Sequence, residues 1–133
     1  MANILIIEDE SAVGAVLQRI IKEMGHQVDM ASDGQKGLDM ALAGQYAVIL
    51  SDLHMPGAIS GMDLLRRLRA ARPQCPVVVV SGYPSAEALG ECEKLGIQDF
   101  LTKPFEMTFV RTIVEKILKA KANAEPGVAK RPS

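Results

Sequence analysis

The sequence contains few cysteines, the residues whose disulfides stabilise small secreted domains, and it lacks the excess of positive charge that is typical of proteins that bind nucleic acid. It has two cysteines and no tryptophan among 133 residues, and aromatic residues make up 4% of it. Cys75 and Cys92 have neither the number nor the spacing of a disulfide framework or a zinc site. We therefore interpret them as small residues of the protein core, in a protein that resides in a reducing compartment. The formal net charge of -1 disfavours direct binding of nucleic acid.

Long hydrophobic runs and targeting segments are missing as well. No apolar stretch approaches the ~20 residues that a membrane span requires, and no charged start precedes an apolar signal segment. We therefore expect a cytoplasmic protein that makes no membrane contact. A chain of 133 residues is typical of a single domain, which buries roughly two-thirds of the surface that its unfolded form exposes.

What the sequence does contain is an alternation of short apolar runs with helical patterns, which predicts βα units and a parallel sheet. Three runs are apolar without alternation, as is typical of central strands covered on both faces, and two are less apolar and fit edge positions. The predicted central strands are Ile4–Ile7, Tyr46–Leu50 and Val77–Val80, and the predicted edge strands are Val28–Ala31 and Gln98–Leu101.

Five amphipathic helices are predicted between and after these strands. The first ends at Gly25, Asp33 can cap the second, and the third begins at about Gly61 and ends before Pro73. The residues expected to face the core are Val13, Val16, Leu17, Ile20, Ile21 and Met24 in the first helix, Leu38, Ala41 and Leu42 in the second, Leu64, Leu65 and Leu68 in the third, Ala88, Leu89 and Cys92 in the fourth, and Val110, Ile113, Val114, Ile117 and Leu118 in the fifth.

Two further segments are interpreted from their polarity. The arginines of the third helix are most simply a solvated face; they are Arg66, Arg67, Arg69 and Arg72. The last helical pattern dissolves at about Lys121, and residues 122–133 contain Pro126, Gly127 and Pro132 without periodicity. We therefore predict one domain over residues 1–121 and a disordered tail or linker stub over residues 122–133.

Polar residues follow four of the predicted strands at their carboxyl ends. Glu8 and Asp9 follow the first, Asp52 closes the third run, Ser81 follows the fourth and Lys103 lies just beyond the fifth. Open α/β sheets bind their ligands at this edge. Acids there can hold a divalent cation while one attacks a phosphoryl group, and a hydroxyl and an ammonium can stabilise the transferred oxygens.

These residues resemble the response-regulator receiver domain of two-component signalling, of the chemotaxis-regulator type, from Asn3 to about Lys121. The matching positions are the acidic pair Glu8-Asp9, the acceptor Asp52 with Met55-Pro56 after it, Ser81, the aromatic Phe100, and Lys103-Pro104. The resemblance implies a doubly wound α/β fold, with a five-stranded parallel sheet in the flavodoxin-like order 2-1-3-4-5 and helices on both faces. The loop from Asp52 to Gly61 is one residue longer than the commonest family spacing, which puts its shape in doubt.

The resemblance also implies a Mg²⁺ site. Three carboxylates in one pocket repel each other unless a cation neutralises them, and a set of oxygen ligands suits Mg²⁺. Asp9 and Asp52 are expected as direct ligands, with the backbone carbonyl of His54, and Glu8 mainly through water. Alone, Glu8 and Asp9 could equally be first-turn acids favoured by the helix dipole.

The remaining site residues receive roles from the same resemblance. Asp52 is the expected phosphoacceptor, Ser81 donates to a phosphoryl oxygen and Lys103 balances its charge. Ser81 and Phe100 form the expected switch, although Phe100 could as well be a core residue. At the mouth of the site Gly82 leaves space, while His54 and Tyr83 either line the entrance or face solvent.

The sequence thus predicts a phosphoryl-accepting signalling switch, which is not an enzyme but assists its own phosphorylation and dephosphorylation. The expected partners are a histidine kinase or histidine phosphotransfer protein, and a downstream protein at the face of the fourth helix, fifth strand and fifth helix; a phosphorylation-dependent dimer is left open. Two alternatives lack a feature that they require. A phosphohydrolase would usually have a second acid at the position of His54, and a nucleotide or flavin binder would have a Gly-rich turn at residues 8–11. A constitutive, unphosphorylated interaction module remains as an alternative.

Overall fold

The computed structural model describes residues 1–55, 57, 59, 61–82, 84–97 and 99–124. Five strands and five helices alternate along the chain. In order they are β1 (Asn3–Ile7), α1 (Ser11–Glu23), β2 (Gln27–Ala31), α2 (Gly34–Ala43), β3 (Val48–Asp52), α3 (Gly61–Ala71), β4 (Val77–Ser81), α4 (Ala86–Lys94), β5 (Asp99–Thr102) and α5 (Met107–Ala124). No helix of the described residues is long and apolar enough to cross a membrane.

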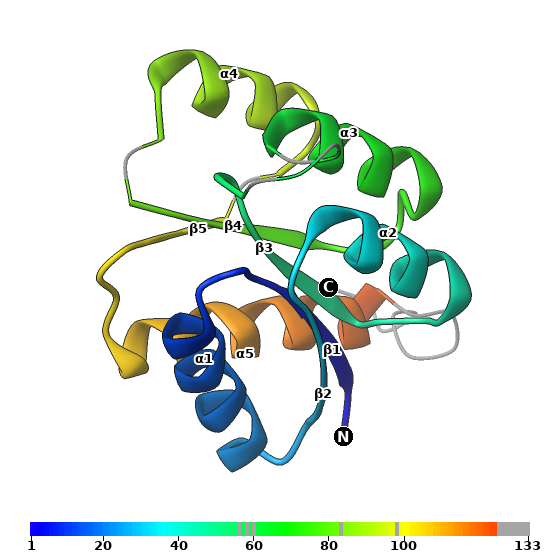
Figure 1. The fold of residues 1–133 in the computed structure, drawn as a ribbon. Coiled ribbons are helices and arrows are strands. Elements are labelled where there is room, and N and C mark those ends of the chain that lie inside the picture. The colour runs from blue at the N-terminus through cyan, green and yellow to red at the C-terminus, as the bar shows by residue number, and fades with distance from the viewer. Residues whose placement is uncertain (56, 58, 60, 83, 98, 125–133) are drawn as a thin grey trace.

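The strands form one parallel sheet in the order β2-β1-β3-β4-β5, as predicted. The apolar strands β1, β3 and β4 are central, and the less apolar β2 and β5 are the edges. Helices α1 and α5 cover one face of the sheet, and α2, α3 and α4 cover the other (Figure 1). Each face has its own buried cluster of aliphatic side chains, which explains why the central strands are apolar on both sides.

All five strands differ by one or two residues from their predicted bounds: β1 and β2 begin one residue earlier, at Asn3 and Gln27, and β4 ends one residue later, at Ser81. The third strand was predicted to begin at Tyr46, but β3 begins at Val48, which pairs with Ile4 of β1, and it extends to Asp52. The Tyr46 hydroxyl instead donates to Asp29 Oδ2 at 2.8 Å, beside the sheet edge. The fifth strand runs one residue beyond the prediction to Thr102, while its predicted first residue, Gln98, lies outside the described residues.

Three residues that were predicted to face the core are exposed: Val16, Leu42 and Leu89. In α1 the buried stripe is narrower than predicted, and Val16 lies about 100° round the helix from the buried Leu17. Helix α2 approaches the sheet through its small residues, which leaves Leu42 at the margin of the contact. Helix α4 buries only Cys92, and Ala88 is half-buried.

The arginines of α3 and the turn after it do not form the uniform solvated face that was predicted. Arg66 and Arg67 are exposed, whereas Arg69 and Arg72 are half-buried. Arg69 donates to the carbonyl oxygens of Leu95 at 3.0 Å and Cys75 at 2.8 Å. Arg72 donates to three carbonyl oxygens at the end of α2, so these two side chains join elements rather than only facing solvent.

Both cysteines are free and buried, as expected for core residues. Burial raises the pKa of each thiol, which keeps both in the protonated form. The last helix continues to Ala124, three residues beyond the predicted limit of the domain. Residues 125–133, most of the predicted tail, lie outside the described residues, so the predicted division at residue 121 stays a prediction.

Candidate functional site

The parallel register brings the predicted site residues to one edge of the sheet. Ile7, the last residue of β1, pairs with Ser51, and Asp52 at the end of β3 pairs with Val80. Ser81 at the end of β4 pairs with Thr102, so Lys103 leaves β5 beside it. The chain positions after these strand ends therefore converge, although they are up to 95 residues apart in sequence.

Asp52 is buried at the centre of this edge. Its Oδ1 accepts a hydrogen bond from the His54 backbone N–H at 2.9 Å, and its Oδ2 accepts one from Lys103 Nζ at 3.0 Å. A carboxylate taken out of water is costly unless charged or polar groups compensate it, and here an ammonium and a backbone amide do so. The two contacts fix the plane of the carboxylate.

Lys103 gathers three acids around one ammonium. Its Nζ lies 2.8 Å from Glu10 Oε1, 3.0 Å from Asp52 Oδ2 and 3.2 Å from Glu8 Oε1. Burial alone would lower the pKa of Lys103, but the hydrogen bonds to these acids outweigh it and hold the pKa well above its usual value. The Lys103 backbone N–H donates to the Ser81 carbonyl at 2.9 Å, and the Lys103-Pro104 bond is cis.

Glu8 is the second buried acid of the site. Burial, followed by the hydrogen bond and the negative charge of Asp52, raises the pKa of Glu8 to about 7. Its Oε2 accepts a hydrogen bond from the Glu10 backbone N–H at 3.1 Å. Its Oε1 lies close to Lys103 Nζ but makes no hydrogen bond within the described part of the chain.

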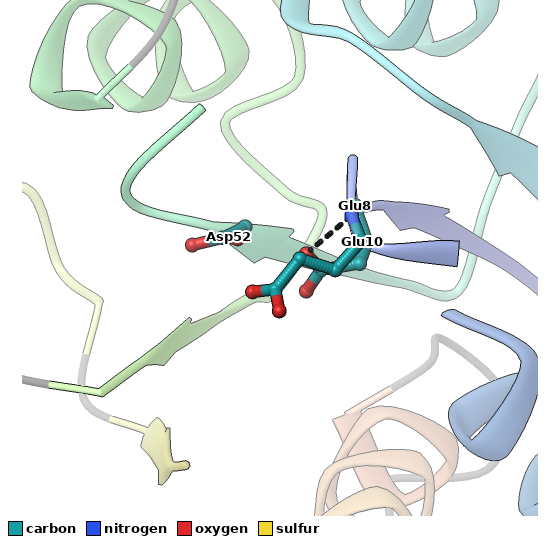
Figure 2. Close-up of side chains that lie close together, drawn as sticks. All are labelled: Glu8, Glu10 and Asp52. Carbon is teal, nitrogen blue, oxygen red and sulfur yellow. Dashed lines mark hydrogen bonds between the residues drawn. The ribbon is translucent and has the colours of Figure 1, made fainter. Parts of the chain in front are cut away.

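Glu8, Glu10 and Asp52 form the one group of acids in the described residues whose ligand atoms lie close enough to hold a metal, within 4.8 Å of one another. Figure 2 shows the three side chains approaching the same point from the ends of β1 and β3. The predicted ligand Asp9 is exposed and does not belong to this group. Its metal role, like that of the His54 carbonyl, stays a prediction.

Sequence reasoning missed Glu10. The signal was available as the third acid of the run Glu8-Asp9-Glu10, but side-chain direction after a strand cannot be read from spacing alone. The chain bends at Asp9 after β1 has ended, so the alternation of side chains along a strand does not extend through this run.

The predicted switch residues lie on neighbouring strands. The Ser81 hydroxyl is buried and makes no hydrogen bond to any described residue, so it is available to a group placed beside Asp52. Phe100 is half-buried and packs against the cluster under α2, α3 and α4. Gly82 has open space where a side chain would stand, His54 is exposed, and Tyr83 lies outside the described residues.

Comparison with known proteins gives a consistent result. The family model of the response regulator receiver domain matches residues 4–115. The chain is 38% identical over 105 residues to the uncharacterized transcriptional regulatory protein YkoG of Bacillus subtilis, covering 79% of this chain and 46% of YkoG. It is 32% identical over 117 residues to the transcriptional regulatory protein CusR of Escherichia coli, covering 88% of this chain and 51% of CusR. The chain thus spans about half the length of these curated relatives.

A solved structure supports the fold. The CheY-like response regulator receiver domain protein of Methanospirillum hungatei superposes with a TM-score of 0.83, covering 91% of this chain and 97% of that one. The two sequences are 24% identical, so this likeness supports the fold alone.

Proposed function

We propose that this chain, which belongs to the response regulator receiver domain family, is a phosphoryl-accepting signalling switch. Asp52 is the proposed acceptor. The observation that carries the assignment is the environment of Asp52. It is a buried carboxylate at the carboxyl edge of a parallel sheet, held by one backbone amide and one ammonium, with a buried hydroxyl on the next strand that has no partner among the described residues.

In the proposed reaction a carboxylate oxygen of Asp52 attacks the phosphorus of a phosphohistidine on a partner protein. The O–P bond forms, the N–P bond breaks, and the imidazole leaves and takes up a proton. Lys103 lies within contact distance of the attacking carboxylate and can follow the charge onto the phosphoryl oxygens. Ser81 can donate to one of those oxygens, because its hydroxyl makes no other hydrogen bond to the described residues.

The residues present fit Mg²⁺. Glu8, Glu10 and Asp52 offer carboxylate oxygens close to one another, the kind of ligand that suits Mg²⁺, and Glu8 Oε1 makes no hydrogen bond among the described residues although it lies 3.2 Å from Lys103 Nζ. Asp52 and Asp9 would hold the ion directly, together with the His54 carbonyl, and Glu8 would act mainly through water, as predicted from the resemblance. When bound, Mg²⁺ neutralises negative charge on the carboxylates and on the transferred oxygens.

The change in state would follow from the added charge of the phosphoryl group. A Ser81 hydroxyl drawn to that group leaves the space next to Phe100, which can then turn inward. This would alter the face of α4, β5 and α5, where Met107 and Phe109 are exposed apolar side chains. We propose that the downstream protein binds there. A phosphorylation-dependent dimer and a cytoplasmic location stay predictions.

Phosphorylation without a partner protein tests the proposal. The chain is incubated with acetyl phosphate and Mg²⁺, and its intact mass is measured. One phosphoryl group adds about 80 Da to the chain through the acyl phosphate of the acceptor. Wild-type protein should gain one such group, and Asp52→Asn should gain none. A wild-type chain that never gains the group would favour the constitutive interaction module.

A further inference from the structure

The three carboxylates around the Lys103 ammonium differ in the energetic cost of moving away from it. The Glu8 and Asp52 side chains are 1% and 3% exposed, whereas the Glu10 side chain is 59% exposed. Moving either buried carboxylate away from the ammonium would leave a desolvated charge without its partner. The Glu10 side chain can rotate out into the solvent without that penalty. This holds although its oxygen makes the shortest of the three contacts with Lys103, at 2.8 Å.

The Glu10 side chain does not cap the start of α1. Glu10 occupies the N-cap position of this helix, with φ of -82° and ψ of 107°, but its side chain makes no capping hydrogen bond. The side chain instead reaches across to Lys103, which follows β5 and lies 93 residues away in sequence. Figure 2 shows its carboxylate near those of Glu8 and Asp52.

The phosphoryl group would need the same ammonium. Lys103 has three N–H donors, and in this structure three carboxylates lie around them. A phosphoryl oxygen on Asp52 competes with these acids for Lys103, and Glu10 is the acid that can release the ammonium at the least cost, because its side chain is exposed. Glu10 also adds an exposed negative charge beside Lys103, where it repels an anionic phosphodonor that approaches Asp52.

We propose that Glu10 is a positioning residue for phosphorylation: it holds Lys103 in the unphosphorylated chain and is the partner that the phosphoryl oxygen replaces. The inference rests on the proposed role of Asp52 and adds to it. It follows that Glu10 restrains the reaction with small anionic phosphodonors, because it competes for Lys103 and repels the incoming charge.

The test compares wild type with Glu10→Gln, which keeps the size of the side chain and removes its charge. Acetyl phosphate and phosphoramidate are used as donors, because at neutral pH the first carries more negative charge than the second. In each reaction the Asp52 O–P bond forms, and acetate or ammonia leaves. Labelling is followed by intact mass at a Mg²⁺ concentration that a separate titration shows to saturate each variant.

We expect Glu10→Gln to react faster with acetyl phosphate at low ionic strength, by roughly three- to tenfold for each negative charge on the donor, taking a separation of about 6 Å and an effective dielectric constant of roughly 40 to 80. The gain should be smaller with phosphoramidate and should shrink as salt screens the charge. A merely structural effect would not depend on donor charge or on salt. The matched control is Glu115→Gln, which removes an exposed acid of α5 outside the Lys103 cluster and should leave the rates unchanged.

The outcomes separate this inference from the proposed function. Equal or slower labelling of Glu10→Gln with both donors, while wild type labels normally, would overturn the role of Glu10 and leave Asp52 as the acceptor. A gain that is the same for both donors and at all salt concentrations would also overturn it. If wild type itself gains no phosphoryl group, the proposed function is wrong and the role of Glu10 falls with it.

Discussion

Gly34, the first residue of α2, lies directly against Ile59 of the loop that follows β3. A Cβ atom at Gly34 would overlap the Ile59 carbonyl oxygen, and Ile59 is itself buried in the core. This contact joins the long loop after Asp52 to the helix packed on β1 and β2. Ile59 is thus a buried residue of this loop that packs against the start of α2.

Gly34→Ala should therefore destabilise the protein by about 1–3 kcal/mol, because the obstacle is backbone and not the end of a flexible side chain. Gly90→Ala is the matched change. Gly90 lies within the exposed α4 with open space around it, so alanine should raise stability by about 0.5–1 kcal/mol through helix propensity. Urea unfolding of both variants checks the pair; a Gly34→Ala variant as stable as wild type would contradict the contact.

Arg72 should contribute more to stability than its place at the surface suggests. It donates to the carbonyl oxygens of Ala41 at 3.0 Å, Leu42 at 2.9 Å and Gly44 at 3.3 Å, which lie at the end of α2 where helical carbonyls lack partners. We expect Arg72→Ala to cost about 1–3 kcal/mol in the free energy of unfolding.

Arg67→Ala is the control for Arg72→Ala. Arg67 forms an exposed pair with Asp63 at 3.2 Å, four residues earlier in α3, and such pairs contribute at most about 0.5 kcal/mol. Chemical unfolding at equal protein concentration compares the two variants. Equal losses of stability would show that the carbonyl contacts of Arg72 contribute nothing beyond a surface charge.

The sequence predicted the sheet and the positions of the site, but not all the contacts within it. Strand ends are readable because an apolar run that stops at Asp52 or Ser81 marks the edge of the sheet, and the parallel order then brings these ends together. The exposure of Leu42 was not readable, because periodicity fixes a stripe and not its width. The partners of Arg72 and the direction of Glu10 depend on segments far away in sequence.

Stability should depend on pH through His26. Burial, and then the positive charge of the chain's N-terminus, lowers the pKa of His26 below its usual 6.5, and its Nδ1 accepts a hydrogen bond from the Ala2 N–H at 3.1 Å. The unfolded chain then binds this proton more readily than the folded one, so the stability contributed by His26 is fully present above pH 6.5 and falls as the pH drops below it, while Glu8, whose pKa is raised, contributes in the opposite direction.

His26→Gln should reduce the part of this decline that lies just below pH 6.5. His54→Gln removes the other histidine and should leave the decline in place, because His26 is untouched. Thermal unfolding across this pH range measures the effect. An unchanged slope in His26→Gln would show that the histidine has the same pKa in the folded and unfolded chain.

Mg²⁺ should stabilise the fold when Glu8 is ionised, well above its pKa of about 7. A ligand that binds only the folded state adds about 2.7 kcal/mol at a hundred times its dissociation constant. From the family resemblance, Asp9→Ala should remove most of this gain, and Glu115→Gln should leave it intact. The shift in melting temperature that Mg²⁺ causes is measured for each variant. A shift in Asp9→Ala equal to that of wild type would mean that Asp9 is not a ligand.

The central claim is that Asp52 itself carries the phosphoryl group. Borohydride reduces an aspartyl phosphate to homoserine, so treatment of the labelled chain followed by peptide sequencing identifies the acceptor. The account predicts homoserine at position 52 of the wild-type chain, and no homoserine in unlabelled protein or in labelled Asp52→Asn. Homoserine at another aspartate of the wild-type chain, or a phosphorylated chain with aspartate intact at position 52, would contradict it.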